Sequence, residues 1–162
     1  MAEPIEPGRK APDFTLNDQH GRPRRLSEFR GQTVVLYFYP KDDTPACTAE
    51  ACDFQEGLTE LGELDAVVIG VSPDDVDSHR RFAEKYGLAF PLLADPPGRN
   101  GEPRIAARYG VWREKLNYGK TYVGLVRTTY IIDPDGRVRH RFDNVRAKGH
   151  VGRVRRWLRE NA

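Results

Sequence analysis

The sequence has only two cysteines among its 162 residues and no apolar run near the roughly 20 residues that a membrane-spanning helix needs. Its first residues lack the basic start and apolar stretch of a secretory signal peptide. We therefore expect a soluble, cytoplasmic protein with no membrane partner. In a reducing compartment, two cysteines are poor candidates for a permanent disulfide and better ones for a transient, catalytic pair.

Closely spaced cysteine and histidine ligands are also lacking. Cys47 and Cys52 have four residues between them, whereas thioredoxin-like reductases place two between theirs. A four-ligand zinc site usually needs clustered cysteine and histidine. The histidines are scattered instead, and we expect them at the surface: His20, His79, His140 and His150. A cysteine–histidine protease pair stays open, because its members need not be close in sequence, although nothing local supports one.

No internal repeat, linker or change of composition divides the chain, so we expect a single domain over residues 1–162. A hydrophobic content of 38% and a charged content of 31% are typical of a globular protein. Acidic residues outnumber basic ones in the first half of the chain, and the reverse holds in the second. We interpret the basic residues as solvent-facing and expect no nucleic-acid partner.

Apolar periodicity and turn residues predict strands alternating with helices. The expected strands cover residues 13–16, 24–26, 33–39, 66–71, 91–94, 125–133 and 138–142, the first two forming an N-terminal β-hairpin. The expected helices cover residues 45–64, 75–86, 102–109 and 149–160, and the stretch 111–124 reads as irregular. This order predicts an α/β domain with a mixed central sheet flanked by helices.

Both cysteines lie in the helix expected over residues 45–64. Thr44 is placed to cap it, and Pro45 suits its first position. Cys47 is then the third helical residue, where backbone N–H groups have no intrahelical partner. The positive end of the helix dipole favours a thiolate there. Cys47 is therefore the leading candidate for a reactive site.

Helix geometry separates the two thiols. At 100° per residue, Cys47 lies within about 40° of the apolar stripe that contains Ala51 and Phe54, while Cys52 lies about 140° from Cys47. Their Cα atoms are roughly 8–9 Å apart in an ideal helix, and a disulfide needs less than about 7 Å. If the two cysteines bridge, the helix must partly unwind. The alternative is that both are ordinary cysteines, one buried and one incidental.

The motif Pro40-x-x-x-Thr44-x-x-Cys47 resembles the signature of the peroxiredoxins, and the wider string 37–54 resembles their bacterioferritin-comigratory, or peroxiredoxin Q, branch. The resemblance covers nearly the whole chain. It continues through residues 11–14, 70–74, 110–115, 119–122, 127–133 and the final helix. One departure is Ala46, where the family usually has glycine.

The resemblance implies a thioredoxin-like three-layer fold and assigns a role to each site residue. Cys47 would be the peroxidatic cysteine, which a hydroperoxide oxidises to a sulfenic acid. Thr44 would hydrogen-bond the thiolate and the peroxide, Arg127 would stabilise the thiolate and the polarised O–O bond, and Pro40 would shield the site from water. Cys52 would be the resolving cysteine, forming an intramolecular disulfide with Cys47.

The implied activity is a thiol-dependent peroxidase acting on hydrogen peroxide and organic hydroperoxides, with thioredoxin or a similar dithiol protein as reductant. No metal or organic cofactor is expected. An intramolecular disulfide needs no partner subunit, so we expect a monomer, or at most a weak homodimer. Two alternatives use the same fold: a thiol–disulfide oxidoreductase or redox sensor without a peroxide substrate, and a copper-handling protein, which would need closer cysteines and a dedicated histidine.

Four further residues near the predicted site receive structural interpretations. Glu50 is read as a charge that favours the helix N-terminus. Trp112, Tyr118 and Tyr122 are read as packing a loop beside the site, not as binding anything specific.

Overall fold

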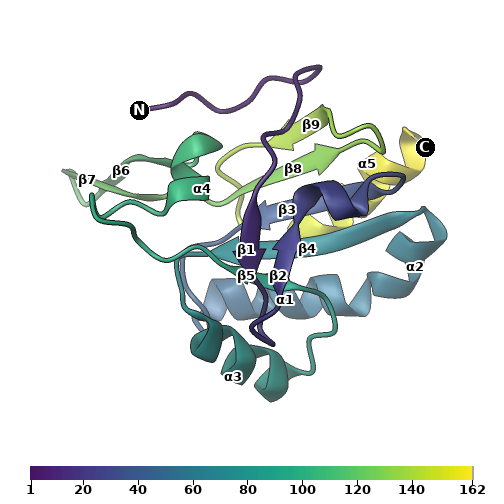
Figure 1. Ribbon diagram of the computed structural model, residues 1–162, viewed down its shortest axis with the longest axis horizontal. Helices are drawn as coiled ribbons and strands as arrows, with labels where there is room; N and C mark the ends of the chain where they lie inside the picture. The colour runs from purple at the N-terminus through teal and green to yellow at the C-terminus, as the bar shows by residue number, and fades with distance from the viewer. Residues whose placement is uncertain (162) are drawn as a thin grey trace.

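The computed structural model describes residues 1–161, in which seven strands form one mixed sheet in the order β2-β1-β5-β4-β3-β8-β9 (Figure 1). The strands of this sheet are β1 (Thr15–Asn17), β2 (Pro23–Arg25), β3 (Thr33–Phe38), β4 (Ala66–Ser72), β5 (Leu92–Ala94), β8 (Thr128–Ile132) and β9 (Val138–Phe142). A second, two-stranded sheet contains β6 (Trp112–Asn117) and β7 (Lys120–Leu125). The helices are α1 (Pro45–Glu56), α2 (Leu58–Glu63), α3 (Val76–Tyr86), α4 (Arg104–Arg108) and α5 (His150–Glu160), with a 3-10 turn over Leu26–Phe29.

Strand β3 lies in the interior of the sheet, between β4 and β8, and nearly every residue in it is apolar and buried. It pairs in parallel with β4 and antiparallel with β8. Successive side chains of a strand point to opposite faces, so β3 contributes to two cores. Val35 and Tyr37 belong to one, and Leu36 and Phe38 belong to the other.

The two cores define three layers. Helices α1, α2, α3 and α5 bury their apolar stripes against one face of the sheet. The N-terminal segment, α4 and the residues that follow α4 cover the opposite face. Figure 1 shows the β6–β7 hairpin at the side of this sandwich, next to α4. The thioredoxin-like, three-layer α/β fold with its N-terminal hairpin is thus confirmed. Within residues 1–161, no helix combines the length and apolar character that crossing a membrane would require.

The helix expected over residues 45–64 is divided at Gly57. There the backbone turns to φ −87° and ψ −2°, so α1 ends at Glu56 and α2 begins at Leu58. Arg155 of α5 passes 3.3 Å from where a Cβ of Gly57 would lie. The missing Cβ of glycine therefore permits this close approach of the last helix.

The prediction that residues 111–124 are irregular was wrong, because they form most of the β6–β7 hairpin. Tyr118 and Gly119 connect the strands with positive φ angles of 51° and 75°, the combination found in tight type I′ hairpin turns. Strand β7 also takes Leu125, so the next strand begins at Thr128 and not at residue 125. Most side chains of this hairpin face solvent, so its sequence lacks the apolar alternation of a half-buried strand.

Candidate active site

Helix α1 begins where the sequence predicts. Thr44 is its N-cap residue, in extended conformation, and Pro45 is its first residue. The Thr44 side chain does not cap the helix; its hydroxyl donates instead to the carbonyl of Lys41 at 2.8 Å. Cys47 is therefore the third residue of α1, on its buried face, with 1% of its surface exposed.

Arg127 reaches the Cys47 thiol from the connection between β7 and β8. Thr128 pairs with Phe38, so the first residue of β8 lies beside the last residue of β3, where the loop toward α1 starts. This register places Arg127 beside the first turn of α1. Its Nη2 donates to Cys47 Sγ at 3.3 Å, although the two residues are 80 positions apart in sequence.

Glu50 completes this contact from one turn further along α1. Its Oε1 accepts a hydrogen bond from Nη1 of Arg127 at 2.6 Å, and none of the residue is exposed. The interpretation of Glu50 as a charge that only favours the helix N-terminus was therefore incomplete. One signal was available, because position 50 follows Cys47 by three residues and so shares its buried face.

Burial shifts the pKa values of Glu50 and Arg127. Loss of solvent raises the pKa of Glu50 to about 7, although the neighbouring Arg127 opposes the shift. Burial alone would lower the pKa of Arg127, but Glu50 and Cys47 outweigh it, so the pKa is raised and the guanidinium stays charged. The thiol thus lies against a permanent cation.

Cys52 lies five residues further along α1 and is half-buried. Burial raises the pKa of its thiol, and the carboxylates of Asp53 and Glu56 raise it further. Both cysteines are free thiols. The expected contrast between a recessed Cys47 and a Cys52 nearer the polar side of the helix is therefore seen.

Pro40 and Thr44 lie at the two ends of the loop that leads from β3 to Cys47. Pro40 follows the strand after Tyr39 and is half-buried. Of the five residues singled out from the sequence, Cys47 and Arg127 are in direct contact, Pro40 and Thr44 flank the loop, and Cys52 lies further along the same helix.

The expectation that all four histidines lie at the surface was wrong for two of them. His79 and His150 are fully buried, at 0% exposure. Each lies on the inward side of an amphipathic helix that also carries many charged residues, which masked its burial in the sequence. His79 belongs, with Asp42 and Asp74, to the one group of potential metal ligands found among residues 1–161.

The three aromatic residues expected to pack a loop beside the site differ in how far they are buried. Trp112 is half-buried and packs against the core to which α4 also contributes. Tyr118 is 97% exposed and Tyr122 is 45% exposed, so neither packs a loop beside the site as expected. Both lie on the β6–β7 hairpin, whose strands pair mainly with each other.

A buried thiol at a helix start, held against a guanidinium, can react as a stabilised thiolate. A second thiol on the same helix can then exchange with it. The model of the AhpC/TSA family matches residues 7–141, a stretch that includes both cysteines and Arg127.

Named relatives agree with this match. The chain is 46% identical over 156 residues to peroxiredoxin Bcp of Bacillus subtilis, covering 96% of each chain. It is 41% identical over 159 residues to peroxiredoxin Bcp of Escherichia coli K12, covering 98% of this chain and 99% of that protein.

Solved structures agree as well. The bacterioferritin comigratory protein of Xanthomonas campestris, described for its alkyl peroxide reduction activity, superposes with a TM-score of 0.86 at 34% identity, covering 96% of this chain and 99% of that one. Peroxidoxin BcpB of Mycobacterium tuberculosis superposes with a TM-score of 0.83 at 36% identity, covering 98% and 99%.

Proposed function

This chain belongs to the AhpC/TSA family and is a thiol-dependent peroxidase, and on that premise we propose that Cys47 is the thiol that the hydroperoxide oxidises. The observation that carries the proposal is the 3.3 Å contact between Arg127 Nη2 and Cys47 Sγ. A guanidinium at that distance stabilises the thiolate relative to the thiol. Within residues 1–161 the groups that act on the Cys52 thiol are carboxylates and include no cation, and the pKa of this thiol is raised.

In the proposed reaction, the Cys47 thiolate attacks the terminal oxygen of the peroxide and the O–O bond breaks. The sulfur is oxidised to a sulfenic acid, and the departing oxygen takes a proton and leaves as water or an alcohol. Arg127 stabilises the negative charge that develops on that oxygen. Pro40 shields the thiol from water at the end of β3.

The role proposed for Thr44 is to hydrogen-bond the reacting groups. Its hydroxyl hydrogen points to the carbonyl of Lys41, which leaves the oxygen free to accept a hydrogen bond from the hydroxyl of the peroxide. Donation to the Cys47 thiolate would require the side chain to rotate. This second contact therefore forms only when the bond to Lys41 is released.

Cys52 is proposed to resolve the sulfenic acid. Its thiolate attacks the Cys47 sulfur, an S–S bond forms, and the hydroxyl of the sulfenic acid leaves as water after taking up a proton. Because ideal helix geometry holds the two Cα atoms roughly 8–9 Å apart, α1 must open between them. Thioredoxin or a similar dithiol protein then reduces the disulfide and is itself oxidised.

The substrates that we propose are hydrogen peroxide and organic hydroperoxides, in line with the alkyl peroxide activity named for the Xanthomonas neighbour. The intramolecular resolution step needs no second subunit, so the proposed working form is a single-domain monomer in the cytoplasm, without a nucleic-acid partner. A thiol–disulfide oxidoreductase without peroxide activity would use the same cysteine pair but would not consume peroxide rapidly.

Addition of one equivalent of hydrogen peroxide to the reduced protein tests the proposal, with thiols and intact mass followed over time. We expect both thiols to be lost and the mass to fall by about 2 Da, for the two hydrogens removed. The Cys47→Ser variant should be inert, and Cys52→Ser should accumulate sulfenic or more highly oxidised Cys47. Peroxide reactivity that persists in Cys47→Ser would overturn the assignment.

A further inference from the structure

The loop over residues 39–44, which joins β3 to α1, is attached to α3 by two consecutive aspartates. Asp42 is 7% exposed, and its carboxylate accepts hydrogen bonds from Tyr39, Ser78 and His79. The oxygen-to-donor distances are 2.5 Å to Tyr39 Oη, 2.8 Å to Ser78 Oγ and 2.7 Å to His79 Nδ1. Its backbone N–H also donates to Asp74 Oδ2 at 2.8 Å. A single loop residue is thus held at four points.

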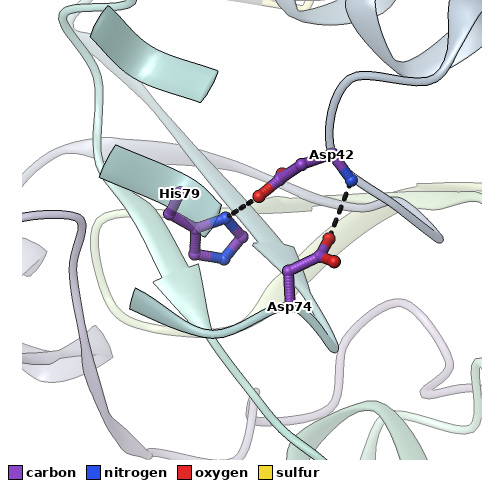
Figure 2. A group of neighbouring side chains, drawn as sticks. All are labelled: Asp42, Asp74 and His79. Atoms are coloured by element: carbon purple, nitrogen blue, oxygen red, sulfur yellow. Dashed lines mark hydrogen bonds and ion pairs between the residues drawn. The ribbon is translucent and has the colours of Figure 1, made fainter. Parts of the chain in front are cut away.

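Figure 2 shows Asp42 between His79 and Asp74, an arrangement that resembles a metal site. The hydrogen bonds of His79 argue against metal binding. His79 Nε2 lies 3.0 Å from the carbonyl oxygen of Leu93, which can only accept, so Nε2 carries a hydrogen. Nδ1 lies 2.7 Å from Asp42 Oδ2, and with a hydrogen on both nitrogens the ring is an imidazolium paired with this carboxylate, so neither nitrogen has a lone pair free for a cation. The cluster is complete as a buried hydrogen-bond network.

The next residue, Asp43, is also bonded to α3, through hydrogen bonds that are exposed to solvent. Its φ of 57° lies in the left-handed region, which non-glycine residues seldom adopt. Such a conformation persists only where the surroundings over-determine it. Two side chains at the end of α3 do so: Lys85 Nζ at 2.8 Å and Tyr86 Oη at 2.7 Å each donate to one carboxylate oxygen of Asp43.

These contacts lie between Pro40 and Thr44, two residues of the proposed site. Lys41, whose carbonyl orients the Thr44 hydroxyl, precedes Asp42 directly, and Thr44 follows Asp43. The position of Thr44 relative to Cys47 therefore depends on the attachment of Asp42 and Asp43 to α3. Helix α3 itself contacts neither Cys47 nor Arg127 through any hydrogen bond among the described residues.

We propose that His79, acting through Asp42, is a positioning residue of the peroxidase reaction: it fixes the loop 39–44 and so holds Thr44 in place at the start of the helix that carries Cys47. This role rests on the proposed function of Cys47. It also assigns a direction to the opening of α1. Because the loop is anchored before Thr44, the unwinding that lets Cys47 meet Cys52 runs into the helix and not back toward β3.

Two substitutions of His79 separate this role from simple loss of packing. In His79→Asn the side-chain amide nitrogen replaces Nδ1 and keeps a donor toward Asp42, whereas in His79→Gln it replaces Nε2 and keeps a donor toward Leu93. Both variants remove the ring. We expect His79→Gln to slow the oxidation of Cys47 by hydrogen peroxide by about tenfold or more, and His79→Asn to recover most of that rate.

The oxidation and resolution steps are measured separately after one equivalent of peroxide, as sulfenic acid formation and then disulfide formation. We expect His79→Gln to slow only the first step. The matched control is Ile105→Ala, a buried position in the core on the opposite face of the sheet. It should lower the melting temperature without slowing oxidation, so a rate loss in proportion to its lost stability would overturn the inference.

Other results would contradict either the positioning role of His79 or the proposed function of Cys47. Equal rate losses in His79→Asn and His79→Gln, or a wild-type rate in His79→Gln, overturn the anchor while leaving the function of Cys47 intact. A wild-type protein that fails to react with peroxide overturns the proposed function itself. If neither His79 variant folds, Ser78→Ala removes one half-buried donor to Asp42 and should slow oxidation about threefold; an unchanged rate in this variant contradicts the role.

Discussion

Glu50 and Arg127 form an ion pair at 2.6 Å in which the carboxylate is wholly buried and the guanidinium also reaches the thiol of Cys47. The pair links the charge on the buried carboxylate to the group that we propose stabilises the thiolate. A buried charge of this kind makes both stability and reactivity depend on its partner.

The first prediction concerns the pH dependence of stability. Burial raises the pKa of Glu50 from 4.5 to about 7 in the folded protein, so the native state binds this proton more tightly than the unfolded chain does. Its contribution to the free energy of unfolding is fully present below pH 4.5 and is lost as the pH rises to 7, by on the order of 3 kcal/mol. Urea unfolding from pH 4.5 to 7.5 measures it. The contribution of Glu50 is the difference in pH slope between the wild type and Glu50→Gln, and equal slopes in the two proteins would contradict the assignment.

Substitutions of Arg127 should separate its catalytic from its structural effect. Arg127→Ala should lower the second-order rate constant with hydrogen peroxide by roughly 10²–10³-fold. Arg127→Lys should recover only part of the rate, since one ammonium cannot reproduce the two-pronged contact with Glu50 and Cys47. Stopped-flow peroxide kinetics measures both variants.

The structural part shows in a double variant. Arg127→Ala leaves the Glu50 carboxylate buried without a partner, so adding Glu50→Gln should restore about 1–3 kcal/mol of unfolding free energy. It should restore none of the peroxide rate, because the cation is still missing. Recovery of the rate in the double variant would mean that Arg127 acts on Cys47 only through Glu50.

His150 should produce a pH dependence of the opposite sign. Burial lowers its pKa from 6.5 to about 4, and the cations of Arg153 and Arg127 act in the same direction. The folded protein therefore favours the neutral ring, and this contribution to stability is present above pH 6.5 and is lost as the pH falls to 4, by on the order of 3 kcal/mol. Comparing His150→Asn with the wild type by urea unfolding across that range measures it. A constant difference between the two proteins would refute it.

A fourth prediction concerns the rate of resolution. Burial raises the pKa of the Cys52 thiol and Asp53 raises it further, so Asp53→Asn should lower it and increase the thiolate fraction at neutral pH. Disulfide formation after peroxide oxidation should then become a few-fold faster. Glu56→Gln, which removes the weaker of the two charges, should give a smaller effect in the same direction. Ultraviolet absorbance of the thiolate in the Cys47→Ser background gives the pKa directly; an unshifted value there would contradict the mechanism.

Local signals made the centre of the molecule predictable. The Thr44–Pro45 start and the apolar stripe containing Cys47 are encoded within a few residues of each other, and the structure has both. The contact of Arg127 with Cys47 spans 80 positions, so no local pattern could reveal it; only the resemblance to the peroxiredoxins placed Arg127 in the site.

Residues whose burial depends on a distant partner were missed. In the sequence, Glu50 and His79 look like ordinary residues of a helix surface. In the fold Glu50 is buried against Arg127, and His79 is buried against Asp42. The β6–β7 hairpin was missed for the opposite reason. It is largely exposed, so its strands have no buried face that would require apolar residues at alternate positions.

The break at Gly57 also sets a time scale. Because α1 stops there, the opening that we propose involves no more than its twelve residues, which would refold after each reduction. A segment of that length reforms in about a microsecond or less. An encounter with a protein reductant at micromolar concentration takes roughly a tenth of a second to ten seconds at ordinary association rates. In the mechanism that we propose, the helix is therefore restored long before the next protein reductant arrives, and refolding of α1 is the faster of these two steps.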